Sequence, residues 1–306
     1  MDSAPRWKLY FGLSRTAHGI LDAATPGMAA LLLLGHFPPV SIVVVGLITA
    51  FAGYTAVYAL NDLIDYRVDR ERLSVSERTG DVFHVDEVMA QHPVAQDMLS
   101  FKSGLVWCAS WAGVALVGAW WLNPVCALLF VVSAVLEATY CKLLRVTHLK
   151  IIPSVAVKSI GGLAGVYAVD PSPSPAFMAI LVLWLSAWEV GGQNIANDIV
   201  DMEADLRVGA KTTLTVKGLS ESVFRLTAAV SMAAVSGVAI YWVAGAGVGW
   251  LYPIAAAVLG WVLLLKPARK VYYEPGKVTA AALFNRASYL PVSFLVIVTI
   301  SLYVPF

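Results

Sequence analysis

Long apolar segments are the feature that most constrains this chain. Runs of about 20 mostly apolar residues, the length that crosses a bilayer as a helix, recur along nearly all of its 306 residues. Only 13% of the residues are charged, against roughly a quarter in typical soluble domains. The sequence therefore predicts an all-α, polytopic membrane protein surrounded by lipids. It excludes a soluble globular enzyme and, with 21 basic against 20 acidic residues and no basic tract, a nucleic-acid-binding protein.

The apolar segments predict about nine transmembrane helices. Four of the short links between them contain no Lys or Arg, and the 21 basic residues lie in the other connections or close to span ends that face them. Because positive charge marks the cytoplasmic side, we expect a cytoplasmic N-terminus and a C-terminus on the outside. The predicted spans are residues 17–36, 39–60, 104–121, 124–141, 151–169, 175–195, 222–245, 248–265 and 286–305.

One connection, residues 70–102, is long, polar and too charged to span the membrane. It is either a solvated linker with one amphipathic surface helix over residues 86–99, or a cap over a site at the cytoplasmic face. Long ordered loops of this kind are often lids, so both interpretations stay open.

An acidic motif occurs twice, each time where an apolar span reaches the basic side. On a continuous helix, at about 100° per residue, each copy presents three carboxylates and one amide on a single stripe. Like charges on one face repel each other, so each stripe requires cations: arginines near the helix ends, or Mg²⁺, which prefers oxygen ligands and phosphate. Two facing stripes could hold two ions around one diphosphate. The copies are Asn61, Asp62, Asp65 and Asp69, and Asn197, Asp198, Asp201 and Asp205.

On these motifs the sequence resembles the UbiA superfamily of intramembrane prenyltransferases over nearly its whole length. Tyr140 with Lys142, and the Gly209-Ala210-Lys211-Thr212 run, also match. The resemblance implies one domain over residues 1–306, with two four-helix repeats and a ninth helix around a central cavity that opens to the cytoplasmic face of the cytoplasmic membrane. The chain departs from the usual pattern in His92-Pro93, and in His18 and Asp22 of the first span.

The resemblance also implies the roles of the motif residues. Two Mg²⁺ ions, bound with a prenyl diphosphate, would be held by Asp62, Asp65, Asp69, Asn197, Asp198, Asp201 and Asp205, with Asn61 binding substrate. Asp62, Asp65, Asp198, Asp201, Tyr140 and Lys142 would carry the catalysis.

Further polar residues are candidates on physical grounds. Charge builds up on the leaving diphosphate, and fixed cations stabilise it; besides Lys142, the candidates are Arg145, Lys150 and Lys211. Deeper in the spans, Glu189 and Gln193 precede the second motif at helical spacing, as Tyr58 precedes the first. An ionisable group within a span is a functional hypothesis, which applies to Glu189. We expect these three residues, as polar side chains at that depth, to bind the acceptor. The alternative for Glu189 is a buried carboxyl that bonds to another helix.

Three functions fit these patterns. The first is Mg²⁺-dependent transfer of a prenyl group from a prenyl diphosphate to a lipophilic or aromatic acceptor. The second is a membrane terpene cyclase, in which a double bond of the same substrate captures the allylic cation. The third is a cation-coupled transporter, which fits less well because its acidic sites should lie near mid-bilayer and not at helix ends.

Overall fold

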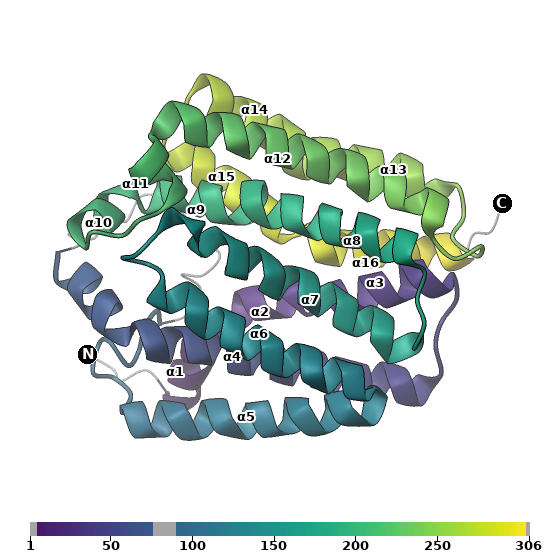
Figure 1. Cartoon of the computed structure of the whole chain (residues 1–306), viewed down its shortest axis with the longest axis horizontal. Helices are drawn as coiled ribbons and strands as arrows, with labels where there is room; N and C mark the ends of the chain where they lie inside the picture. The colour runs from purple at the N-terminus through teal and green to yellow at the C-terminus, as the bar shows by residue number, and fades with distance from the viewer. Residues whose placement is uncertain (1–4, 76–89, 304–306) are drawn as a thin grey trace.

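The computed structural model describes residues 5–75 and 90–303. Over these ranges the chain is helical, and its long helices lie side by side along one axis (Figure 1). Nine helical segments of the described chain are long and apolar enough to cross a membrane. The predicted all-α polytopic fold is therefore confirmed.

The N-terminal half of the chain supplies the first four spans. A short helix, α1 (Arg6–Leu13), precedes them. The spans are α2 (Thr16–Asp22) with α3 (Ala24–Leu34), then α4 (Val40–Val75), α5 (Phe101–Leu122) and α6 (Pro124–Lys142).

The remaining five spans include several breaks in helical geometry. The fifth span is the 3₁₀ turn His148–Lys150 with α7 (Ile151–Val169), and the sixth is α8 (Pro175–Trp188), the π-helical turn Glu189–Asn194 and α9 (Ile195–Val200). The seventh span is α12 (Leu219–Ala239) with the 3₁₀ turn Ile240–Val243, and the eighth is α13 (Leu251–Leu259), the π-helical turn Gly260–Leu265 and α14 (Lys266–Tyr273). The ninth span is α15 (Lys277–Ser288) with α16 (Leu290–Tyr303). Two short helices, α10 (Met202–Arg207) and α11 (Thr213–Lys217), connect the sixth span to the seventh.

Several predicted spans are shorter than the helical segments that form them, the second and the ninth by nine residues or more at one end. The second was expected over 39–60, but α4 continues to Val75 and carries the first acidic motif within it. The ninth was expected from residue 286, whereas the helical segment begins at Lys277. In both places charged residues end the apolar pattern, while the helical backbone continues because it satisfies its own hydrogen bonds regardless of hydropathy.

The prediction of a surface helix over 86–99 is wrong for residues 90–99, the part of this range that the structure describes. Residues 90–99 form turns, and residues 86–89 lie outside the described ranges. Pro93 explains the difference, because a proline disfavours the α conformation of the residue before it; His92 has a φ of 48°. Of the polar connection 70–102, residues 70–75 belong to α4 and residues 101–102 to α5.

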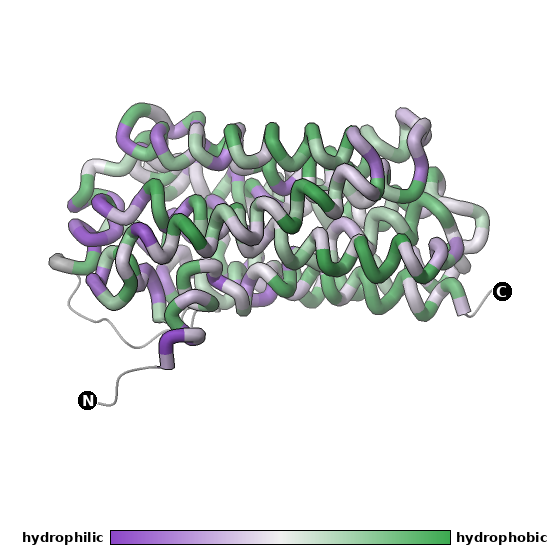
Figure 2. The backbone as a smooth tube through the Cα atoms, turned by 90° about the horizontal axis from the view of Figure 1, so that it is seen from below, coloured by the Kyte–Doolittle hydropathy of each residue, from purple (hydrophilic) through white to green (hydrophobic). Residues whose placement is uncertain are grey.

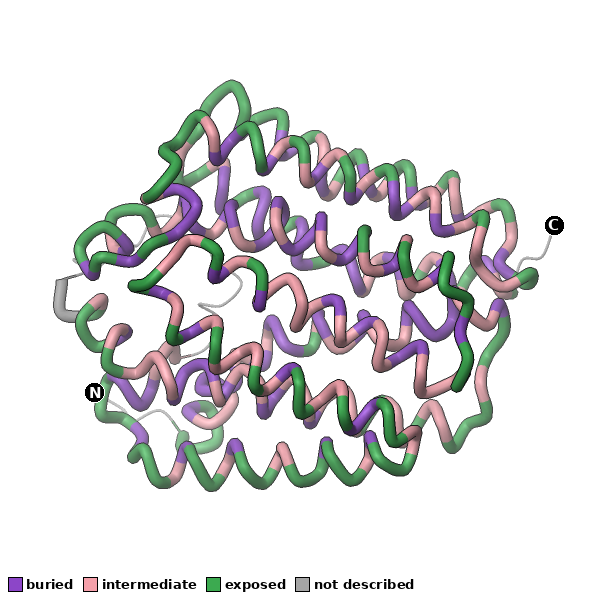
Figure 3. The backbone as a smooth tube through the Cα atoms, in the orientation of Figure 1, coloured by how far each residue is buried: buried purple, intermediate pink, exposed green. Residues whose placement is uncertain are grey.

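Large aromatic side chains fill the core between the later spans. Trp184, Trp188, Tyr252 and Phe294 are almost fully buried there. Elsewhere the helices approach closely: a Cβ on Gly165 of α7 would lie 2.1 Å from the carbonyl oxygen of Pro26 in α3. On the outside, α5 is mostly exposed (Figure 3) and apolar, as a helix that faces lipid should be.

The bundle has one hydrophilic end. Hydrophilic residues gather at the end where α1 and α10 lie (Figure 2), and the last turn of α16 lies at the opposite end (Figure 1). Both acidic motifs are at the hydrophilic end. The cytoplasmic assignment of this end stays a prediction from the positive-inside rule.

Candidate active site

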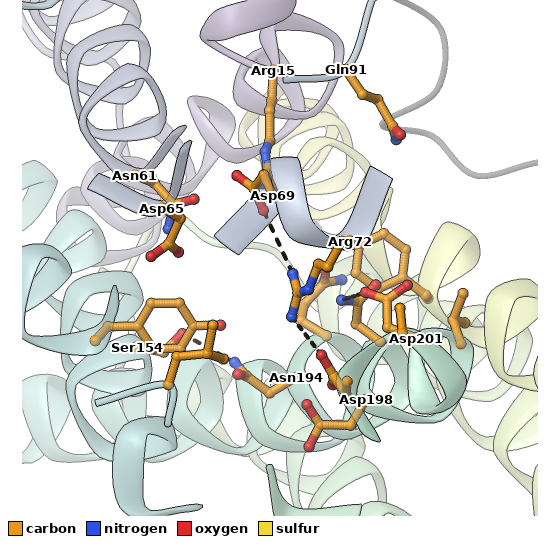
Figure 4. Close-up of a pocket in the computed structure, with 18 of the residues that line it drawn as sticks. Arg15, Asn61, Asp65, Asp69, Arg72, Gln91, Ser154, Asn194, Asp198 and Asp201 are labelled. Atoms are coloured by element: carbon orange, nitrogen blue, oxygen red, sulfur yellow. Dashed lines mark hydrogen bonds and ion pairs between the residues drawn. The ribbon is translucent and has the colours of Figure 1, made fainter. Parts of the chain in front are cut away.

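A cavity of about 1390 Å³ extends from the hydrophilic end into the bundle. Both copies of the acidic motif line it, although four spans separate them in the sequence. Figure 4 shows Asn61 and Asp65 on one side and Asp198 and Asp201 on another. Seven of the eight motif residues are in the wall: Asn61, Asp65, Asp69, Asn197, Asp198, Asp201 and Asp205.

The first copy lies on the continuous helix α4 and meets a histidine from the 90–99 segment. His92 Nδ1 lies 2.7 Å from Asp62 Oδ1 and 2.9 Å from Asp69 Oδ2. Asp62 is 1% exposed and faces this histidine. Burial opposes the charge on His92, but hydrogen bonds to the two carboxylates outweigh it and raise the pKa of the imidazole to about 9. His92 is therefore a cation between two carboxylates at neutral pH.

The second copy does not lie on one helix, contrary to the single stripe expected from its spacing. Helix α9 ends at Val200, Asp201 leaves the helical conformation with φ −94° and ψ 7°, and α10 starts at Met202. Within this bend Asn197 Nδ2 donates to Asp201 Oδ2 at 2.9 Å. The backbone N–H of Thr213 donates to Asp198 Oδ2 at 3.1 Å.

Arg72 joins the two copies. Its Nη2 lies 2.5 Å from Asp205 Oδ1 and its Nη1 lies 3.8 Å from Asp69 Oδ1 (Figure 4). Arg72 is one of the arginines near the helix ends that the sequence offers as counter-charges for the acidic stripes, and the structure shows this pairing. It follows Asp69 by three residues and so shares its helix face.

Of the predicted cations, the structure brings only Lys150 to the carboxylates. Lys150 is 6% exposed, lines the cavity, and donates to Tyr140 Oη at 3.2 Å with its ammonium 4.5 Å from the ring centre. Lys142, Arg145 and Lys211 are exposed and lie outside the cavity wall; Arg145 pairs with Glu71.

Two non-glycine residues of the cavity wall have strained backbone. Arg15, between α1 and α2, has a φ of 43°, and His92 has a φ of 48°. Such conformations cost free energy and cluster at functional sites. Arg15 points toward Asp69 (Figure 4), so both strained residues direct cationic side chains at the first acidic copy.

The deep end of the cavity carries a second set of polar groups. Asp22 accepts hydrogen bonds from Tyr58 and Lys158, and Lys158 Nζ also donates to Tyr58 Oη at 3.0 Å. Gln193 Nε2 donates to Ser288 Oγ at 3.3 Å. Tyr58, Lys158, Glu189 and Gln193 all line the cavity, so the predicted deep residues do share one space with the motifs.

The carboxylate end is suited to a hard cation. Carboxylate oxygens of Asp62 and Asp69 lie within 4.8 Å of each other beside His92. Asp62 Oδ2 is buried and accepts no hydrogen bond within the described chain. A buried carboxylate oxygen without a donor is costly, and a metal ion is one way to satisfy it. The predominance of oxygen donors in the two motifs fits Mg²⁺.

Comparisons with known proteins identify the family of this chain. The model of the UbiA prenyltransferase family matches residues 23–289. No curated protein sequence matches the chain.

Solved structures share the fold. An apo UbiA homologue from Aeropyrum pernix K1 is 16% identical with a TM-score of 0.69, over 93% of this chain and 97% of that one. A UbiA homologue from Archaeoglobus fulgidus, solved with GPP and Mg²⁺, is 14% identical with a TM-score of 0.66, over 97% and 100%. A structure described as digeranylgeranylglyceryl phosphate synthase is 18% identical with a TM-score of 0.67, over 98% and 99%. Since the family model matches most of its length, the chain belongs to the UbiA prenyltransferase family.

Proposed function

We propose that this protein is a Mg²⁺-dependent prenyltransferase that transfers a prenyl group from a prenyl diphosphate to a lipophilic or aromatic acceptor within the membrane. The observation that carries the proposal is the meeting of two N-D-x-x-D-x-x-x-D copies on one cavity. The likeness to a homologue solved with GPP and Mg²⁺ supports it. In our proposal the site opens to the cytoplasmic face of the cytoplasmic membrane.

The acidic residues would hold the metal. Asp62, Asp65 and Asp69 would form one half-site, and Asn197, Asp198, Asp201 and Asp205 the other. Bound Mg²⁺ would neutralise negative charge on the diphosphate oxygens. Residues 90–99 would form part of a cap over this end, because His92 reaches the first half-site and Arg70 of α4 donates to the carbonyl oxygen of Ala95.

Two cations of the chain are placed to bind the leaving group. When the bond between the allylic carbon and the diphosphate oxygen breaks, its electron pair goes to the diphosphate. Lys150 and Arg72 are cavity cations beside the carboxylates, and they would stabilise this charge. We assign the diphosphate contact to them in place of the exposed Lys142, Arg145 and Lys211.

The deep end would receive the acceptor. The new bond forms between the allylic carbon and the acceptor, whose proton must leave. Glu189, buried in the cavity wall, is the residue placed to take that proton. Tyr58 and Gln193 would orient the acceptor beside it, while the apolar bundle keeps water from the allylic cation.

Purified protein offered geranyl, farnesyl or geranylgeranyl diphosphate tests this function. We expect release of diphosphate with Mg²⁺, none in excess EDTA, and prenylated products by mass spectrometry when a panel of acceptors is added. Full turnover in EDTA would exclude the metal-bound site. A cyclic hydrocarbon formed equally with and without acceptor would indicate a terpene cyclase, and no diphosphate release under any condition would refute both.

A further inference from the structure

One buried carboxylate at the deep end of the cavity accepts hydrogen bonds through only one of its two oxygens. Glu189 is 3% exposed and begins the π-helical turn Glu189–Asn194. Its Oε1 accepts from Ser154 Oγ at 2.8 Å and from Asn194 Nδ2 at 2.5 Å. Its Oε2 is buried and has no hydrogen-bond partner within the described residues. π-Helical turns inside helices are frequent at functional sites.

The two donors fix the direction of this carboxylate. Asn194 Nδ2 also lies 3.0 Å from Ser154 Oγ, so the three side chains form a closed set. Ser154 and Asn194 point toward one another (Figure 4), and both line the cavity together with Glu189. Leaving a buried carboxylate oxygen in place without a hydrogen-bond donor is costly. A ligand with an N–H or O–H group would satisfy it.

The neighbouring cation is already neutralised. Lys158 donates to Asp22 and to Tyr58, and its ammonium lies 5.7 Å from the centre of the Trp188 ring. His18 Nε2 also faces Asp22, at 3.7 Å. An anionic ligand would therefore meet Lys158, whose charge is already neutralised by Asp22, and it would also be repelled by the carboxylate of Glu189. An uncharged donor meets no such repulsion.

Glu189 lies on the acceptor side of the cavity. It precedes Asp198 by nine residues along the sixth span, which corresponds to roughly 13 Å of helical rise. The diphosphate end is occupied by the two acidic copies, so a donor group bound at Glu189 comes from the other substrate.

Building on the proposed function, we infer that the reacting group of the acceptor is an uncharged hydroxyl, of an alcohol or a phenol, that donates a hydrogen bond to Glu189 Oε2, and not a carboxylate. The hydroxyl completes the hydrogen bonding of the carboxylate, and Glu189 in turn selects against acids by like charge.

Three matched probes test the inference without turnover. Para-nonylphenol, para-nonylanisole and para-nonylbenzoate share one tail but present a donor, an ether and an anion. Their affinities for wild-type protein in lipid nanodiscs are measured at neutral pH by equilibrium retention, corrected for empty nanodiscs. We expect the phenol to bind about tenfold more tightly than either other probe, as for one hydrogen bond to a charged group.

Glu189→Gln should lower phenol affinity about tenfold. Glu221→Gln, the same change on α12 at a side chain that is 44% exposed, should leave it unchanged. Equal or tighter binding of the benzoate or the anisole by wild type overturns the inference, and so does wild-type phenol affinity in folded Glu189→Gln. The probe comparison uses wild type, so it decides the question even if the variant does not fold. Diphosphate release is measured separately, so a failure of the prenyltransferase proposal is seen as such.

Discussion

The two acidic copies have the same pattern but different structures. The first lies within α4, which continues for six residues beyond Asp69 to Val75, so its carboxylates follow the helical period. The second crosses the junction between α9 and α10, where Asp201 leaves the helix. Helical spacing therefore predicts which side chains share a face only where the helix is continuous. The motif itself does not specify whether the helix continues.

The copies also differ in the source of their counter-charges. His92, from a turn segment, lies between Asp62 and Asp69 of the first copy. The second copy relies on Arg72, which belongs to the helix of the first, and on the backbone N–H of Thr213. The second half-site thus depends on the first, whereas the first depends on the 90–99 segment.

The largest expected effect tests whether both copies are needed. Asp62→Ala and Asp198→Ala should each lower diphosphate release about 100-fold or more, because each removes a group that supports charge stabilisation at the leaving group. Asp170→Ala, in the link after α7, should retain full activity. Near wild-type turnover in either motif variant would show that the two copies are not both needed for activity.

The next effect concerns the first copy alone. Because the pKa of His92 is raised from 6.5 to about 9, its ion pair should stabilise the metal-free protein fully below pH 6.5 and be lost as the pH rises through about 9. The loss should amount to at most about 3 kcal/mol. Melting in EDTA between pH 6 and pH 10 measures it, and His92→Gln should flatten the curve; an equal slope in the variant would assign the pH dependence elsewhere.

A smaller effect tests the bridge between the copies. Arg72→Met should destabilise the metal-free protein by about 2 kcal/mol, since it leaves Asp205 and Asp69 without their shared cation. Arg225→Met removes the exposed pair with Glu221 and should cost less than about 0.5 kcal/mol. Equal shifts in melting temperature for the two variants would show that the Arg72 bridge stabilises the protein no more than an exposed ion pair does.

The smallest effect concerns the second copy. Thr212 caps α11 through the N–H of Thr215 and so positions the neighbouring amide of Thr213. Thr212→Ala should cost about 1 kcal/mol and also slow diphosphate release. Ser100→Ala, which removes the corresponding cap of α5, should cost a similar amount and leave the release rate unchanged. Equal rates of diphosphate release in the two variants would show that the cap of α11 does not affect the function of Asp198.

Much of the fold could be predicted because its signals are local. Nine spans follow from apolar length, and the position of both motifs at one end of the bundle follows from their place after the apolar runs. The errors came at charged residues, where α4 and α15 continue although hydropathy falls, and at Pro93, whose effect on His92 ended the predicted surface helix. The division into two four-helix repeats stays a prediction.

The sequence by itself determined a membrane bundle with two clusters of carboxylates, because apolar length and charge are properties of single segments. Only the tertiary structure decided which cations meet those carboxylates: Lys150 and Arg72 enter the cavity, whereas Lys142 and Lys211 remain outside. It also decided that His92 lies between Asp62 and Asp69 and that Glu189 keeps one oxygen free at the deep end. These contacts join residues far apart in the chain, and their distances are set by how the helices pack, which no local pattern encodes.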